Sequence, residues 1–434
     1  MVLAGAPSPK PPTTLNPNQV RGFWAAWGGW ALDGMDASIY ALVLFPALTD
    51  LLPRSGVAAT PGAIGYYGSV LLALFLFGWG LSMVWGPVAD RFGRVRALML
   101  TILWYSLFTF LCGLVTNIWQ LAVLRVLCGI GIGGEQPIGG TFVAEEWPED
   151  RRKMGAGYMH TGYYFGFFLA ALANYFIGAS FGWRWMFILG GAPALLVGWI
   201  RRGVRESAAW QQRLGDKQRR PGMGQAFAEL FSRRYLRRTI VMSLLFLLSI
   251  IGLWAGSIYV PTAVTQIALR QGHAARDAAR LASYGTGVLS TGTILGCIAL
   301  PVIAERLGRR QTLGLYFGLM GASIAVAFGY VFYMPQALQL FFMMVFLLGV
   351  GGANFAMYTL WIPELYTTEC RASAIGFTSS VGRFAGCGMV FLVGAAIARF
   401  GSLGTPVAWT SIAFLLGLLV LPFAGETRGK PLPI

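Results

Sequence analysis

Long apolar stretches separated by short polar loops make up most of the chain. Twelve of these stretches are long enough to cross a lipid bilayer as α-helices, which takes about 20 mainly apolar residues. The expected spans are 23–48, 64–86, 97–115, 118–143, 155–178, 185–200, 240–260, 281–303, 313–332, 338–360, 374–397 and 407–423. The pattern therefore predicts an all-α membrane protein with twelve transmembrane helices.

The composition agrees with a lipid bilayer as the surrounding medium. Of the 434 residues, 56% are hydrophobic and 12% are charged, whereas soluble domains carry about 25% charged residues. The net charge of +16 would suggest a nucleic-acid partner in a soluble chain. Here most Lys and Arg residues gather in loops on one side of the spans, so we expect no nucleic-acid partner.

The distribution of Lys and Arg predicts the orientation. Both ends of the chain and the long loop at 201–238 carry the excess of basic residues, which places them in the cytoplasm. The first 20 residues lack the apolar segment of a cleaved signal peptide. We expect a cytoplasmic tail at 1–22, helical bundles at 23–200 and 239–423, a cytoplasmic linker at 201–238 and a second tail at 424–434, in a cell (inner) membrane.

The two halves of the chain repeat with an offset of 219 residues. Ser38-Ile39-Tyr40 corresponds to Ser257-Ile258-Tyr259, and Glu206-Ser207 is followed 220 residues later by Glu426-Thr427. Such a repeat predicts two six-helix bundles related by an axis along the membrane normal, with a site at the midplane between them.

Charged and glycine residues follow a shared spacing in the loops after the second and eighth spans. The first loop reads Gly86-Pro-Val-Ala-Asp90-Arg91-Phe-Gly93-Arg94, and the second contains Glu305, Arg306 and Arg309. The acids and arginines can pair across the bundle ends in one state and separate in another. The residues expected to form such a conformational gate are Gly86, Asp90, Arg91, Gly93, Arg94, Glu145, Arg152, Glu305, Arg306, Glu364 and Arg371.

The motif after the second span resembles the GxxxDRxGR signature of the major facilitator superfamily. Further motifs lie in the fourth span, from Arg125 to Glu135, in Asp33-Gly-Met-Asp36, in Gly382-Arg383-Phe-Ala-Gly386 and in Gly425-Glu-Thr-Arg-Gly-Lys430. Together they resemble proton symporters of the sialate/lactate type most, and those for aromatic acids next. The resemblance implies a twelve-helix transporter. Two distant histidines offer no catalytic constellation, so we expect neither an enzyme nor a cofactor, and we expect a monomer.

Asp33 and Asp36 lie one helical turn apart inside the first span. A carboxylate at the centre of a bilayer costs about 2.5–3.5 kcal/mol even on insertion scales, so the pair needs a cation or a proton. Arg125 in the fourth span is the expected cation. Either the three residues form a permanent ion pair, or one acid, with Asp36 favoured as the one facing the cavity, exchanges a proton.

The remaining charges inside the spans are Glu135 and Arg383. Glu135 is either a second proton site or a residue that stabilises a helix end. Arg383 has no acid in the second six spans to match it, so it either pairs across the halves or binds an anionic substrate. Both arrangements can alternate, and their exchange would couple substrate to proton.

The repeat shows that these acids occur in one half only. Positions 252 and 255, which correspond to Asp33 and Asp36, hold Gly and Ala. We therefore expect the first bundle to handle protons and the second to hold a small organic carboxylate, such as a monocarboxylate, an aromatic acid or a sugar acid. Asn354, Tyr358, Tyr163 and Tyr164 are candidate hydrogen-bonding residues of the cavity or packing residues.

The alternative function is transport of a neutral sugar, a polyol or an organic cation on the same fold. The tail at 425–430 resembles the PETKGK tail of the wider sugar and organic-ion groups, without its Pro, and so allows this function. The lone Arg383 argues against it. The five cysteines and two histidines match no disulfide framework or metal-site spacing, so no metal is expected.

Overall fold

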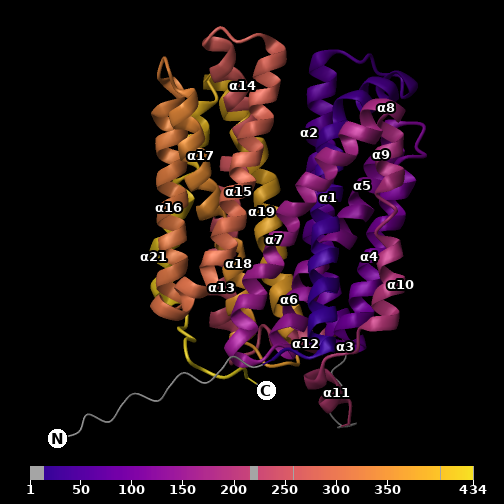
Figure 1. The fold of residues 1–434 in the computed structure, drawn as a ribbon, viewed down its shortest axis with the longest axis vertical. Coiled ribbons are helices and arrows are strands. Elements are labelled where there is room, and N and C mark those ends of the chain that lie inside the picture. The colour runs from indigo at the N-terminus through magenta and orange to yellow at the C-terminus, as the bar shows by residue number, and fades with distance from the viewer. Residues whose placement is uncertain (1–13, 216–222, 258, 401, 434) are drawn as a thin grey trace, which may run out of the picture.

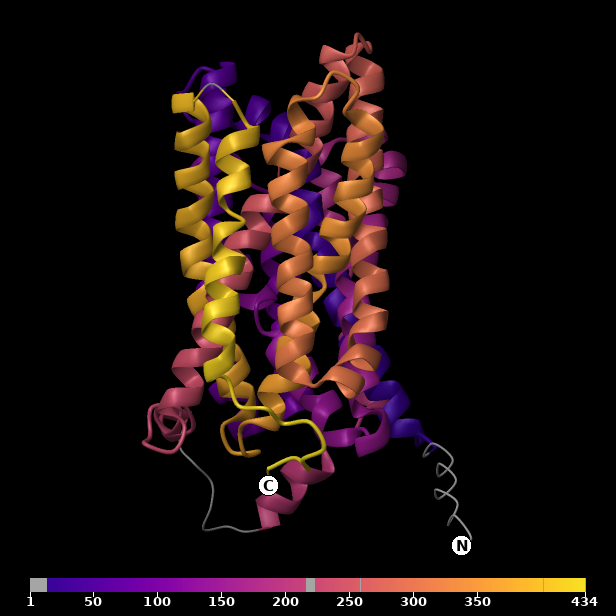
Figure 2. The ribbon, with the colours of Figure 1, turned by 90° about the vertical axis from the view of Figure 1, so that its left-hand side faces the viewer.

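A computed structural model describes residues 14–215, 223–257, 259–400 and 402–433, and its described residues are helical or irregular, with no strand. The first thirteen residues of the expected tail and part of the expected linker lie outside this range. Two groups of helices stand side by side along the long axis (Figure 1). When the molecule is turned by 90°, the second half of the chain lies in front of the first (Figure 2).

The first bundle contains the helices of the first half of the chain. They are α1 (Pro17–Arg54), α2 (Pro61–Leu81), α3 (Trp85–Phe92), α4 (Arg94–Cys112), α5 (Ile118–Ile132), α6 (Glu135–Glu146), α7 (Glu149–Ala173), α8 (Ala179–Phe181), α9 (Trp183–Leu189) and α10 (Ala194–Gly203). Short helices α11 (Ala208–Gly215) and α12 (Met223–Glu229) follow at one end of the molecule (Figure 1), called the linker end below.

The second bundle repeats this arrangement. Its helices are α13 (Leu236–Ser257), α14 (Val260–Arg270), α15 (Ala275–Leu307), α16 (Arg309–Gly329), α17 (Leu338–Gly352), α18 (Asn354–Trp361), α19 (Arg371–Phe400), α20 (Gly404–Trp409) and α21 (Ile412–Val420). Each bundle has its own apolar core: one large cluster lies in the second, and two clusters lie mainly in the first.

The predicted membrane fold is confirmed. Among the described residues, eight helical stretches are long and apolar enough to cross a membrane, and α1, bent by 65° at Pro46, makes a ninth. The three remaining expected spans, 155–178, 240–260 and 374–397, lie mainly in α7, α13 and α19. The two bundles meet through α7 against α15 and through α2, α3 and α6 against α19.

Several expected spans are broken rather than continuous, and two of the breaks occupy equivalent positions of the two halves. The fourth span ends at Ile132 and resumes at Glu135, and the tenth ends at Gly352 and resumes at Asn354. Both of these breaks, between Ile132 and Glu135 and between Gly352 and Asn354, follow glycine-rich sequence, where helix propensity is low. The first break places Glu135 at the start of α6.

Two glutamates outside the spans cap equivalent helices. Glu206 accepts hydrogen bonds from the backbone N–H groups of Val95 and Arg96 at 3.1 and 3.0 Å. Glu426 accepts those of Arg309 and Arg310 at 3.0 and 3.1 Å. The repeated Glu-Ser and Glu-Thr pairs of the sequence therefore satisfy the free N–H groups at the starts of α4 and α16.

The glycine before each of these helices has a backbone that other residues rarely adopt. Gly93 has φ 109° and Gly308 has φ 91°. A side chain is strained in this region, which explains the glycine of the DRxGR motif. The carboxylate of each capping glutamate lies directly against its glycine.

We predict that Glu426→Gln lowers the unfolding temperature by about 2–4 °C, because a lost helix cap costs about 1 kcal/mol. Burial raises the pKa of Glu426, but hydrogen bonds from four backbone N–H groups outweigh it and hold the pKa below its usual range. The stabilisation is thus complete above the unfolded pKa of about 4.3 and is lost as the pH falls through the folded value.

Thermal unfolding of the purified protein at pH 7 and in steps below pH 4 measures this effect. Glu369→Gln, which removes a carboxylate that caps neither α4 nor α16, serves as the control. Equal unfolding temperatures for wild type and Glu426→Gln at pH 7 would contradict the prediction.

Candidate functional site

At the linker end, each bundle builds the same buried ion-pair unit. Arg94 pairs with Asp90 at 3.1 Å and with Glu145 at 2.9 Å. In the second bundle, Arg309 pairs with Glu364 at 2.9 Å and with the partly exposed Glu305 at 2.7 Å. The hydroxyl groups of Ser207 and Thr427 donate to Glu145 and Glu364, each at 2.6 Å.

Two further arginines join these units across the bundles. Arg371 of α19 pairs with Glu145 at 3.1 Å, and Arg152 of α7 pairs with Glu364 at 3.4 Å. Each unit therefore takes its additional arginine from the other half of the chain. All four side chains are almost fully buried, and among the described residues the ion pairs between bundles lie at this end only.

The backbones of α3 and α19 also meet here. Asp90 accepts hydrogen bonds from the backbone N–H of Ser373 at 2.9 Å and from its hydroxyl at 2.6 Å. A Cβ on Gly86 would lie 2.6 Å from the Cα of Ser373, so glycine permits the close approach. The linker end is closed in this structure.

Not every residue expected in the gate takes part. Arg91 and Arg306 are exposed at the linker end, and the pairs found in the described chain do not include them. Arg309 carries the role in the second bundle that Arg94 has in the first, and Glu206 and Glu426 fix the two helix starts. These roles could have been predicted from sequence, because the Gly-Arg and Glu-Ser/Thr pairs occur in both halves.

Near the middle of the first bundle lie three fully buried acids. Asp33 is within electrostatic reach of Glu135, Asp36 and Arg383, but neither of its carboxylate oxygens has a hydrogen-bond partner. Glu135 accepts a hydrogen bond from Thr101 at 3.1 Å. Its second oxygen lies against Gly29 of α1 and is unpartnered.

Asp36 points into the first bundle. It accepts a hydrogen bond from the thiol of Cys128 at 3.1 Å, and its other oxygen lies near Gly190 without a partner. Asp33 is the acid that lies toward Arg383 of the second bundle. Asp36, expected to face the cavity, lies instead near Thr109, Cys128 and Gly190 of the first bundle.

Arg125 forms no ion pair with either aspartate in this structure. Its guanidinium lies between two rings, 4.4 Å from the centroid of Tyr40 and 4.2 Å from that of Phe75, and its three nitrogens have no hydrogen-bond partner. Asp36 is its nearest acid in electrostatic terms. The ring faces take the role expected of the carboxylates, since cation–π contacts offset part of the cost of burial.

Arg383 of α19 reaches across to the first bundle. Its Nη2 donates to Oε1 of Gln136 at 2.9 Å, and its guanidinium lies 4.6 Å from the ring centroid of Trp79. The residue is only 5% exposed, and its Nη1 has no partner. A buried guanidinium held by one neutral amide and one ring can exchange this partner for an anion.

Of the four candidate hydrogen-bonding residues, Tyr163 joins this group. It lies within electrostatic reach of Arg383, and its ring contacts Trp30 at 5.0 Å. Tyr164 instead lies near Thr293 and Cys297 of α15.

The other two candidates belong to the second bundle. Asn354 is occupied there by hydrogen bonds with Ser249, Gly351 and Met320. Tyr358 packs its ring on Phe246 at 4.7 Å. The contacts of these two residues do not connect them to Arg383.

Gln136 and Trp79 are functional candidates that sequence reasoning missed. The repeat offered a signal for both, since positions 355 and 298, at the 219-residue offset, hold Phe and Ile. Like the acids, these polar groups occur in one half only.

The chain was also compared with known proteins. Residues 26–389 match the model of the Major Facilitator Superfamily. The chain belongs to this superfamily. It is a multi-pass membrane transporter and not an enzyme.

Relatives span almost the whole chain. A probable 4-methylmuconolactone transporter of Cupriavidus pinatubonensis is 30% identical, covering 95% of this chain and 92% of its own. The sialic acid transporter NanX of Escherichia coli is 24% identical, covering 96% of each chain. The gallate transporter of Pseudomonas putida is 27% identical, covering 93% of this chain and 91% of its own.

Among solved structures, the proton:xylose symporter XylE bound to 6-bromo-6-deoxy-D-glucose superimposes with a TM-score of 0.73. It is 18% identical, and the match covers 96% of this chain and 98% of that one. This likeness concerns the fold.

We predict that Arg371→Gln opens the linker end. Removing one partner of a buried ion pair costs about 3–5 kcal/mol, so amide exchange of residues 86–94 and 371–376 should speed up at least about tenfold. Hydrogen–deuterium exchange measures this change, with the exposed Arg91→Gln as control. Unchanged exchange in Arg371→Gln would show that the ion pairs do not hold the bundles together.

Proposed function

We propose that the protein carries a small organic carboxylate into the cell together with one or more protons, by alternating access. The observation that carries this proposal is Arg383, a buried cation between the bundles whose partners are neutral. A guanidinium presents two parallel N–H donors that match a carboxylate. The substrate would bind Nη1, which is unpartnered, and displace Gln136 from Nη2.

The relatives support the choice of an anion. Gallate, niacin and sialic acid, which name three of the related transporters, are all carboxylic acids. A neutral sugar or polyol would leave the charge of Arg383 uncompensated in the hydrocarbon layer, which is costly. We therefore place the carboxylate of the substrate on Arg383, with Trp79 and Tyr163 beside it.

The acids of the first bundle would carry the proton. Asp33 has no hydrogen-bond partner and lies toward Arg383, so its ionisation and the charge at the substrate site affect one another. Asp36 and Arg125 lie deeper in the same bundle. In the closed structure, ionised acids here would be uncompensated charges in hydrocarbon, which is costly. Release of the proton would therefore require the transporter to change its conformation.

The linker-end ion pairs would act as the gate. In the present structure they hold the bundles together at this end, so we assign it to a state closed on that side. The excess of Lys and Arg at the same end supports a cytoplasmic location in a bacterial inner membrane. Opening would separate Arg371 from Glu145 and Arg152 from Glu364, and a single chain supplies all of these residues.

We predict that Arg383→Lys weakens carboxylate binding about 10- to 100-fold, because hydrogen bonds to charged groups contribute about 1.5–3 kcal/mol and lysine lacks the planar pair of donors. Binding of lactate, sialate, benzoate and the neutral sugar xylose to purified protein at two pH values measures the effect. Arg184→Lys, at the end opposite the linker, is the matched control. Full carboxylate affinity in Arg383→Lys would reject the assigned role.

We predict that Asp33→Asn abolishes substrate accumulation driven by a pH gradient in proteoliposomes, while exchange of substrate across the membrane without net proton movement persists. A neutral amide cannot take up and release the proton. Asp36→Asn tests the second acid in the same assay, and Asp150→Asn, on the exposed start of α7, is the control. Accumulation that ignores the pH gradient in the wild type would refute proton coupling.

A further inference from the structure

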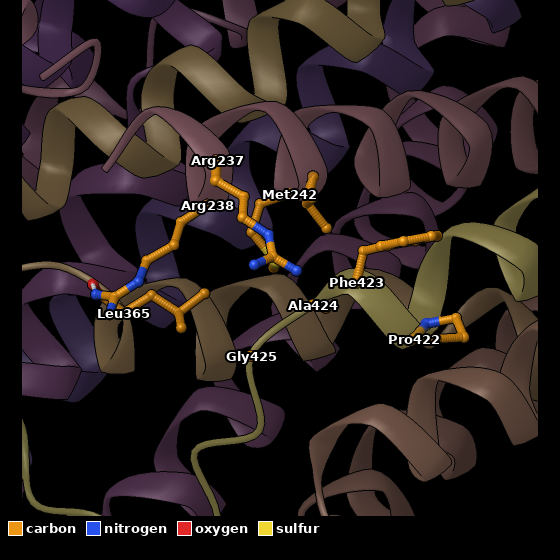
Figure 3. A pocket seen from close by; sticks show the side chains of 9 residues that line it. Arg237, Arg238, Met242, Leu365, Pro422, Phe423, Ala424 and Gly425 are labelled. Carbon is orange, nitrogen blue, oxygen red and sulfur yellow. Dashed lines mark hydrogen bonds between the residues drawn. The ribbon is translucent and has the colours of Figure 1, made fainter. Parts of the chain in front are cut away.

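A pocket lies at the linker end of the second bundle, where its lining residue Leu365 directly follows Glu364 of the gate. It is lined by Arg237, Arg238, Val241 and Met242 of α13, by Leu365, and by Pro422, Phe423, Ala424 and Gly425 after α21. Its volume is about 230 Å³. Figure 3 shows Arg237 extending toward the turn of Phe423 and Ala424, and Arg238 toward Leu365.

The pocket combines a basic rim with an apolar wall. Arg237 and Arg238 are both exposed, and Nη1 of Arg238 donates to the backbone oxygen of Leu365 at 2.9 Å. That bond fixes the second guanidinium at the edge of the pocket. Val241, Met242 and Leu365 supply apolar surface below it, so the pocket suits a group that is anionic at one end and apolar at the other.

The surface next to the pocket is apolar and exposed. Ile240 of α13 is 56% exposed, Leu419 of α21 is 70% exposed and Phe423 is 61% exposed. The helices α13 and α21 contact each other, and in a membrane protein such exposed apolar residues face lipid chains. The arginines therefore lie where this exposed apolar surface ends.

The repeat shows that the residues at two of the pocket positions differ between the halves. Asn18 corresponds to Arg237 at an offset of 219, and Arg205 corresponds to Gly425 at the offset of 220 that relates the two capping glutamates. In the first half, Oδ1 of Asn18 accepts the N–H of Arg205 at 2.7 Å, and its Nδ2 donates to the oxygen of Arg205 at 3.4 Å. Asn18 thus ties the start of α1 to the backbone of Arg205.

The second half has different contacts at the positions that correspond to Asn18 and Arg205. The oxygen of Gly425 accepts a hydrogen bond from Trp361 at 3.0 Å, and Arg237 lines the pocket beside Gly425. Where the first half has the short, neutral Asn18, the second half has the long, charged Arg237, and it lies beside Gly425, which has no side chain. Shared folding requirements of the two bundles do not account for this difference.

We propose that the pocket binds the phosphate of an anionic phospholipid, with Arg237 and Arg238 on the phosphate and an acyl chain along Ile240 and Leu419. Guanidinium groups bind phosphate through paired hydrogen bonds, and basic clusters next to membrane spans recognise anionic headgroups. The bound lipid would link α13 to the end of α21 and so stabilise the second bundle. This role is independent of the transported substrate.

The purified full-length protein tests the proposal by native mass spectrometry and thermal unfolding with phosphatidylglycerol, phosphatidylcholine or inorganic phosphate. We expect one retained phosphatidylglycerol and a raised unfolding temperature with that lipid alone. The double variant Arg237→Gln/Arg238→Gln should retain it about 30-fold more weakly, which corresponds to about 1 kcal/mol per arginine. Arg237→Gln alone keeps the bond from Arg238 to Leu365 and should lose about fivefold.

The matched control is Arg233→Gln/Arg234→Gln, which removes the same charge from the same segment but from residues outside the pocket. Equal loss of lipid in the two double variants would overturn the proposal in favour of diffuse attraction. Equal retention of phosphatidylcholine would overturn it as well. Protection by inorganic phosphate alone would identify a site for free anions instead.

Discussion

The central constraint on this structure is the burial of one cation, Arg383, at the contact between the two bundles. Arg383 extends from α19 to the first bundle, where Gln136 and Trp79 are its partners. A guanidinium in hydrocarbon is costly, and one amide with one ring compensates it only in part. The same incompleteness applies to Asp33, whose carboxylate oxygens are unpartnered. The centre of the protein thus holds a cation and an acid that are incompletely compensated, as the proposed binding of an anion and a proton requires.

The linker end follows the opposite design. There every buried charge of the two repeated units has a partner of opposite sign, and the units exchange Arg152 and Arg371 between the halves. The two bundles are therefore held together at this end by two equivalent sets of ion pairs, one for each unit. A molecule with complete compensation at one end and incomplete compensation at its centre can change state when an occupant alters the balance at the centre.

Much of the fold and part of the site could be predicted from sequence. The period of apolar stretches predicts the twelve spans, and the repeat places Arg152 and Arg371 at equivalent positions. The partner of Arg383 could not be predicted, because it depends on the helix break before Glu135 that reorients Gln136. The orientation of Asp36 likewise depends on how α1 is rotated against α4 and α5, a property of packing that a spacing of three residues does not determine.

Simultaneous recording of substrate uptake and external pH in lightly buffered proteoliposomes tests the central claim most directly. If a carboxylate on Arg383 enters together with a proton, uptake alkalinises the outer solution in a fixed ratio to the substrate carried. Arg383→Lys should reduce both signals in parallel. Uptake of the carboxylate with no change of external pH would contradict the account.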